Sequence, residues 1–186
     1  MRIIGIDPGL TRLGVGVIDR GAGQALHLVD VQVLRTAPNA DITERLLSLH
    51  RGLAEILEAL QPDALALERV FAQHNVRTVM GTAQVSGVVI TLAAEHNIPV
   101  SHRTPSEVKA AVTGYGGAKK PQVQTMVKNI LGLDAVPKPA DAADALALAI
   151  TEAWRGGAPS AQPTNSPETP AQRAWREALK RSSNLG

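Results

Sequence analysis

Four acidic residues stand where the surrounding sequence is apolar. Asp7 closes the run Ile-Ile-Gly-Ile, Glu68 closes Ala-Leu-Ala-Leu, and Asp141 and Asp144 stand in an Ala/Leu-rich segment. Their spacing of three puts Asp141 and Asp144 on one face of a helix. Carboxylates that converge from strand ends and a helix start suit Mg²⁺, which prefers oxygen ligands and keeps several waters. The pattern predicts a divalent-metal site.

Each of these residues alone also has a simpler interpretation. Asp7 lies in Asp-Pro-Gly, a common turn sequence. Glu68 could meet an arginine at a strand end. Asp141 could cap a helix, with Asp144 favoured by the helix dipole in the first turn. The four together, in this order along the chain, are harder to explain in these ways.

The hydrophobic patterns predict the elements that must position these residues. Apolar and alternating runs predict strands over 2–7, 14–20, 26–34, 64–68 and 98–102. Helical spacing predicts helices over 42–60, with Asp41 or Thr43 as the cap, and over 75–94, 105–112, 121–131 and 140–154. This order predicts an α/β fold, a mixed sheet flanked by helices.

Composition bounds the function classes. The 186 residues include no cysteine, which excludes disulfides, thiolate zinc sites and thiol nucleophiles. Residues 69–138 hold eight basic and three acidic residues, whereas residues 1–68 hold six basic and nine acidic. A basic middle beside carboxylates favours a polyanion-binding surface, although a solvated face would give the same count.

The ends of the chain and its uncharged stretch complete the organisation. The longest uncharged run, 78–94, falls short of the roughly 20 apolar residues that a membrane span needs, so we expect no membrane segment. From residue 155 the sequence becomes rich in Pro, Gly and Ser. We therefore expect a single domain over 1–154 and a disordered tail over 155–186.

Three stretches carry a resemblance to a known family. GIDPG at 5–9, LERVF at 67–71 and ADAADALA at 140–147 resemble the signature stretches of the RuvC family, the bacterial Holliday junction resolvases or crossover junction endodeoxyribonucleases. The stretch KKPQVQ at 119–124 resembles the same family. The match covers about residues 1–153, and it includes the spacing and order of the motifs.

The resemblance implies a fold, a reaction and a set of partners. It implies an RNase H-like five-stranded mixed sheet and a homodimer that cuts four-way DNA junctions, leaving 5′-phosphate and 3′-hydroxyl ends. Asp7, Glu68, Asp141 and Asp144 match the catalytic, metal-binding tetrad, which would hold Mg²⁺ or Mn²⁺, with two ions per site. It also implies branch-migration proteins as partners and a cytoplasmic location.

The basic middle and the only phenylalanine supply candidate DNA contacts. Lys119 and Lys120 precede a predicted helix, whose free amides favour anions. Phe71 could stack on an unpaired base at the junction centre, or could belong to the core. The full set of candidates is Phe71, Lys109, Lys119, Lys120, Arg69 and Arg77, with Arg103 a weaker one. The helix 75–94 carries small residues, and its part 81–94 is the expected dimer contact.

Three other functions remain open on the sequence. An actin-like sugar kinase or ATPase also begins with a strand followed by Asp-x-Gly, but it needs a second such loop, which this chain lacks. A module that binds branched DNA without cutting has no use for four carboxylates. An RNase H acting on RNA–DNA hybrids is compatible with the fold alone.

Overall fold

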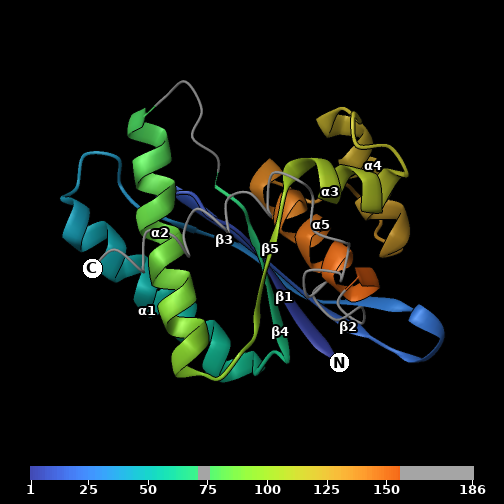
Figure 1. Cartoon of the computed structure of the whole chain (residues 1–186), viewed down its shortest axis with the longest axis horizontal. Coiled ribbons are helices and arrows are strands. Elements are labelled where there is room, and N and C mark those ends of the chain that lie inside the picture. Colours follow the sequence, from blue (N-terminus) through green and yellow to red (C-terminus); the bar gives the residue numbers. More distant parts are fainter. Residues whose placement is uncertain (71–75, 156–186) are drawn as a thin grey trace, which may run out of the picture.

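A five-stranded sheet with the strand order β3-β2-β1-β4-β5 forms the centre of the molecule (Figure 1). The computed structural model describes residues 1–70 and 76–155, apart from the side chains of 24, 76 and 77. The strands are β1 (Arg2–Asp7), β2 (Arg12–Arg20), β3 (Leu26–Arg35), β4 (Ala64–Glu68) and β5 (Val100–Arg103). Strands β1, β2 and β3 are antiparallel, whereas β4 and β5 run parallel to β1. The sheet is mixed, as predicted, and β1 is its central strand.

Five α-helices and one short 3₁₀ turn complete the described chain. The helices are α1 (Ile42–Leu60), α2 (Val76–Glu95), α3 (Pro105–Thr113), α4 (Lys120–Ile130) and α5 (Ala140–Arg155), and the turn Ala22–Gln24 joins β2 to β3. Asp41 caps α1, because its side chain accepts a hydrogen bond from the Thr43 amide at 2.8 Å. Thr104 and Glu107 form a capping box that starts α3. The predicted helices are all present, with ends shifted by a residue or so.

The prediction for the last strand was wrong at its start. The sequence pattern placed it over 98–102, but β5 spans Val100–Arg103. The reason lies at the end of α2, where Asn97 adopts a left-handed conformation with φ 57° and the Ile98 amide donates to the Ala93 carbonyl. The backbone amide of Ile98 therefore donates to a carbonyl at the end of α2, and Ile98 does not pair with β4. Helix α4 begins one residue earlier than predicted, at Lys120 rather than Pro121.

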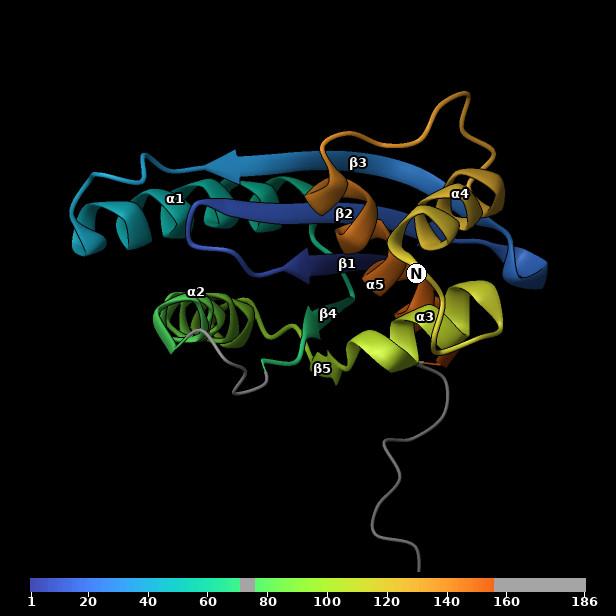
Figure 2. The same cartoon turned by 90° about the horizontal axis from the view of Figure 1, so that it is seen from above.

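Helices cover both faces of the sheet, and the alternation of side chains along the strands separates two cores. Helices α1 and α2 lie on one face, and α3, α4 and α5 lie on the other (Figures 1 and 2). In β1, Ile4 and Ile6 pack with α1 and α2, whereas Ile3 packs with α5. Odd-numbered positions of β1 thus face α5, and Asp7 is the next of them. In β4, Leu65 and Leu67 face α1 and α2, so Glu68 shares the α5 face.

Glycines allow α5 to approach the strands unusually closely. A Cβ added to Gly5 would lie 2.1 Å from the Ala145 carbonyl oxygen, and one on Gly14 would lie 2.3 Å from that of Asp141. A Cβ added to Gly16 would lie 2.7 Å from the Leu146 amide nitrogen. Buried alanines on the facing side of α5 complete the contact. The glycines of β1 and β2 therefore set how near the start of α5 comes to Asp7.

A buried ion pair fixes the other end of α5 to the edge of the sheet. The Arg103 guanidinium donates to Glu152 at 2.6 and 3.0 Å, and the Ser101 hydroxyl donates to the same carboxylate at 3.2 Å. Only 18% of the Arg103 side chain and 5% of the Glu152 side chain are exposed. The charge of Arg103, a candidate DNA contact in the sequence, is thus paired with a carboxylate inside the protein.

Helix α2 is both a core helix and an exposed apolar one. Among the described residues, its stretch Thr78–Glu95 alone is long and apolar enough to cross a membrane by length and composition. Its Val85, Val89 and Leu92 are buried in the core shared with α1. Only 33% of this stretch is buried, so the core contacts account for one face of the helix. The predicted tail, apart from Arg155 at the end of α5, lies outside the described residues.

Candidate active site

The carboxylates of Asp7 and Glu68 lie next to each other at the carboxyl ends of β1 and β4. Strands β1 and β4 are parallel and pair Ile6 with Leu67, so the residues that follow occupy neighbouring positions. Both side chains face α5 by strand alternation. They share a hydrogen bond. Two parallel strands that end in carboxylates thus create one half of the site.

The start of α5 supplies the other half. Asp141 and Asp144 lie in its first turns, and their charges act on Asp7. Each is paired with a cation from a different element. The Arg12 Nε atom lies 2.9 Å from an Asp141 oxygen, and the Lys120 Nζ atom lies 2.5 Å from an Asp144 oxygen. The four predicted acidic residues are brought together, with two cations at their outer side.

Burial and mutual repulsion make this cluster hard to ionise fully. Burial is the main cause that raises the pKa of Asp7 from 3.8 to about 8, and the charges of Glu68, Asp144 and Asp141 add to it. Burial also raises the pKa of Glu68, although its hydrogen bond from Asp7 opposes the change. The pair therefore holds a proton at neutral pH. Such a cluster has an excess of negative charge that a bound cation would relieve.

The donor chemistry fits a hard divalent cation. All four side chains offer carboxylate oxygens, the ligands that Mg²⁺ and Mn²⁺ prefer. Within 1–70 and 76–155, however, no three acidic or histidine side chains are gathered closely enough to enclose an ion as they stand. Instead, Asp141 is paired with Arg12 and Asp144 with Lys120. Binding of a cation by all four carboxylates would require release of these two pairings and of the proton shared by Asp7 and Glu68.

A cleft beside the carboxylates contains two of the predicted DNA contacts. It measures about 220 Å³ and is lined by Glu68 and Asp144 together with Lys109 and Lys120. Partial burial lowers the pKa of Lys120, but the hydrogen bond and charge of Asp144 outweigh this and raise the pKa overall. Lys120 is therefore a permanent positive charge at the rim of the acidic cluster.

The other candidate DNA contacts lie around this edge or outside the described chain. Lys119 is exposed, and its amide donates to the Gln122 side chain at 2.8 Å, which starts α4. Arg69 is exposed just after β4, where its amide donates to the Arg103 carbonyl. Arg77 lies in the first turn of α2, but its side chain is outside the described set, and Phe71 lies outside it entirely.

Arg12 is a site residue that the sequence pattern did not indicate. Its pairing with Asp141 places it at the site. The sequence could have indicated it, because Arg12 starts the strand that pairs antiparallel with β1. Arg12 must therefore lie at the same end of the sheet as Asp7. Arg12 and Asp7 are five positions apart in the sequence, and their proximity in space follows only once 2–7 and 12–20 are recognised as a hairpin.

Comparisons with known proteins match most of the chain. The family model described as "Crossover junction endodeoxyribonuclease RuvC" matches residues 3–152. A protein of that name from Leifsonia xyli subsp. xyli is 53% identical over 96% of this chain and 91% of its own length. One from Nocardioides sp. is 60% identical over 85% of this chain and 89% of its own length. Among solved structures, Thermus thermophilus RuvC in complex with a Holliday junction substrate has a TM-score of 0.80 at 36% identity, covering 84% of this chain and 94% of that one.

Proposed function

The chain belongs to the RuvC family of crossover junction endodeoxyribonucleases, and we propose that it resolves four-way DNA junctions by cutting the phosphodiester backbone at the Asp7 cluster. The observation that carries this proposal is the convergence of Asp7 and Glu68, from two parallel strands, with Asp141 and Asp144 from α5. The similar Thermus thermophilus protein is described in complex with such a junction, which supports the same substrate here.

The four carboxylates would hold the divalent cation that this family uses. We infer Mg²⁺ or Mn²⁺, two ions per site, with Asp7 on the central strand serving both, Glu68 one, and Asp141 and Asp144 the other. When bound, divalent cations supply charge stabilisation at the scissile phosphate and a water that ionises near neutral pH. The expected products are 5′-phosphate and 3′-hydroxyl ends.

The chain's own cations have separate tasks in this proposal. Lys120 keeps its charge through its contact with Asp144, and once Asp144 turns to a metal ion, the ammonium group is available to the scissile phosphate or its neighbour. Lys109 shares the same cleft. Lys119, Arg69 and Arg77 would neutralise phosphates farther out, and Phe71, directly after the Glu68 strand, would stack on an unpaired base.

A homodimer is the second part of the proposal. Resolution needs two nicks, and each chain has one carboxylate cluster, so a two-fold axis supplies the second site. Helix α2 presents an exposed apolar stripe at helical spacing, formed by Met80, Ala83, Gly87, Ile90 and Ala94. A Cβ on Gly87 would meet no atom within 4 Å, so a partner helix can approach it closely. This stripe supports the predicted dimer contact on 81–94.

We infer that the partners are branch-migration proteins of the same pathway and that the protein acts in the cytoplasm. We also infer that residues 1–154 form the nuclease domain and that 155–186 form a tail outside it.

One experiment tests the proposed function. The protein is incubated with Mg²⁺ and a synthetic four-way junction, a linear duplex of the same sequence, an RNA–DNA hybrid, or ATP. We expect paired nicks in the junction only, with ends that ligate directly. Cutting of the hybrid in preference to the junction would favour an RNase H, and ATP hydrolysis would favour the kinase-like alternative. Binding of the junction without any cleavage would overturn the proposal.

A further inference from the structure

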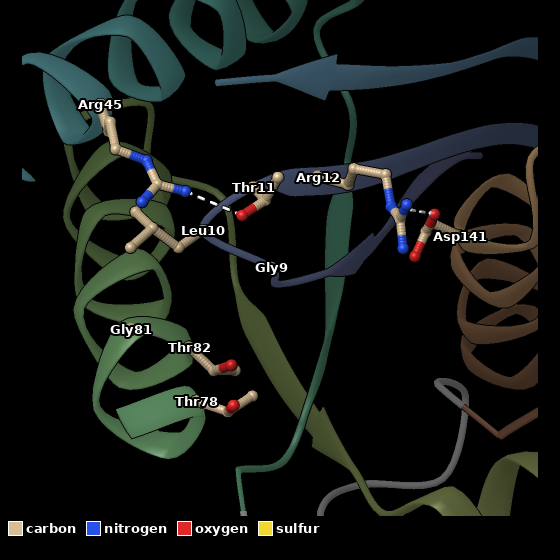
Figure 3. A pocket seen from close by; sticks show the side chains of 9 residues that line it. All are labelled: Gly9, Leu10, Thr11, Arg12, Arg45, Thr78, Gly81, Thr82 and Asp141. Carbon is tan, nitrogen blue, oxygen red and sulfur yellow. Dashed lines mark hydrogen bonds and ion pairs between the residues drawn. The ribbon is translucent and has the colours of Figure 1, made fainter. Parts of the chain in front are cut away.

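A second polar pocket lies beside the carboxylate cluster, on the other side of Asp141. It measures about 340 Å³ and lies between the β1–β2 turn, the start of α1 and the first turns of α2 (Figure 3). Its lining is Gly9, Leu10, Thr11, Arg12, Arg45, Thr78, Gly81, Thr82 and Asp141. Asp141 is thus a wall shared by the pocket and the cluster, and none of the candidate DNA contacts from the sequence lines it.

Arg45 gives this pocket a fixed positive charge. Its guanidinium donates to the Thr36 hydroxyl at 2.9 Å, the Thr11 hydroxyl at 2.8 Å and the Pro38 carbonyl at 3.4 Å. All three acceptors are neutral, and the described residues offer Arg45 no carboxylate within 4 Å. Three hydrogen bonds hold the side chain in place without cancelling its charge. A fixed, uncompensated guanidinium favours an anionic ligand.

The remaining walls of the pocket supply two hydroxyl groups and a second arginine. Thr78 and Thr82 are one helical turn apart on α2, and Figure 3 shows both side chains on the side of the helix that faces the strands. Between them, Gly81 leaves room for Leu10, which a Cβ would meet at 3.3 Å. Arg12 lies at the opposite end of the pocket from Arg45, where it contacts Asp141 (Figure 3).

We propose that this pocket binds one backbone phosphate of the DNA strand that is being cut, with Arg45 as its fixed ligand and Arg12 as its exchangeable one. The inference rests on the proposed function, since it assumes that the scissile phosphate lies at the carboxylates. A strand placed there continues past Asp141 into the pocket. Arg12 then exchanges Asp141 for the phosphate, which releases Asp141 toward the metal site. Binding of the strand in the pocket thereby makes Asp141 available to join the other three carboxylates.

The test measures junction binding in EDTA by wild type and by Arg45→Met, as a function of salt. The variant should lower the slope of log affinity against log salt by about 0.9, the value for one phosphate contact on duplex DNA. Arg51→Met is the matched control, because Arg51 is an exposed arginine of the same helix outside the pocket. It should leave the slope at the wild-type value. Equal slopes for all three proteins would overturn the proposal.

Single methylphosphonate substitutions, which neutralise one phosphate at a time, locate the contact. One substitution on the cut strand near the scissile position should weaken wild-type binding and have no further effect on Arg45→Met. Equal losses in both proteins at every position would overturn the proposal. Should Arg45→Met unfold, Thr82→Val, which removes one hydroxyl, replaces it, and it must lose affinity at that same phosphate.

The wild-type protein separates this inference from the function on which it rests. If it does not cut the junction in Mg²⁺, the proposed function fails. If it cuts while the Arg45→Met slope and the methylphosphonate profile are unchanged, only the phosphate pocket fails.

Discussion

At the scale of the residue, the chemistry depends on how much negative charge the site holds. Asp7 is the most perturbed of the four acids because it is buried at the end of the central strand with three other carboxylates around it. Its ordinary state in the metal-free protein at neutral pH is the protonated one. Removing its charge by mutation should therefore change metal binding far more than it changes DNA binding.

Asp7→Asn should abolish cleavage while leaving junction binding intact. Loss of one ligand removes several kcal/mol of charge stabilisation at the phosphate, so the cleavage rate in Mg²⁺ should fall by orders of magnitude. In EDTA at pH 7, affinity should match wild type, because Asp7 is already protonated there; at pH 9 the variant should bind more tightly. Cleavage assays and filter binding measure both. Asp134→Asn, an exposed change, serves as control, and near-normal cutting by Asp7→Asn would refute the site.

The same pKa predicts how the stability of the metal-free protein depends on pH. Folding raises the pKa of Asp7 from 3.8 to about 8, so the folded state binds the proton more tightly than the unfolded state. The favourable contribution is complete below about pH 4 and is lost as the pH rises toward 8. In EDTA, Tm should fall across this range, and the decrease should be smaller for Asp7→Asn. Parallel Tm curves for the two proteins would contradict this.

At the scale of the element, α5 is positioned from both ends, by the strand glycines near Asp141 and by the Arg103–Glu152 pair at its far end. The second contact is a buried charge pair, so the two residues depend on each other. Removing one partner leaves the other buried without compensation, whereas an exposed pair loses little when it is broken.

Glu152→Gln should destabilise the protein by about 3–5 kcal/mol, because it leaves the Arg103 charge buried. Asp19→Asn is the matched control, since the Arg2–Asp19 pair has exposed fractions of 34% and 40%. It should cost at most about 1 kcal/mol. Urea denaturation gives both values. Equal and small losses would show that the buried pair is not what holds α5 to β5.

Much of this arrangement could be predicted from the sequence, and the exceptions have physical reasons. The apolar runs that end in Asp7 and Glu68 and the Asp-x-x-Asp spacing in α5 led to the four carboxylates. The predicted RNase H-like fold is confirmed by the strand order and by the similar solved structure. Arg12 and Arg45 were missed because their partners come from other elements. The pairing of Arg103 with Glu152 could not be predicted, because the sequence does not show that the two residues face each other.

At the scale of the whole molecule, the proposed two-fold axis depends on the outer face of α2. Ile90 lies in the middle of its apolar stripe with 40% of its surface exposed. A charge there would be buried against the partner helix. The expected contact is therefore sensitive to one substitution that the isolated subunit tolerates.

Ile90→Glu should convert a dimer into a monomer with an unchanged fold. Leu47→Glu on α1, at a side chain 48% exposed, is the control and should remain dimeric. Sedimentation measures the mass, and circular dichroism checks the fold. The monomer should nick junctions without resolving them, because the two cuts are no longer made by one particle. A wild-type protein that sediments as a monomer, both free and on a junction, would end the dimer proposal.

The close contact between α5 and the strand glycines affects how a genetic screen of this protein is interpreted. Alanine at Gly5, Gly14 or Gly16 places a methyl group less than 3 Å from the α5 backbone. In a library of random variants, these positions would therefore be among the least tolerant, although none carries a reactive group. Their loss-of-function alleles should be accompanied by low protein abundance, whereas alleles of Asp7 should accumulate to normal levels. Abundance measured beside survival thus separates the residues that hold the helix from those that cut DNA.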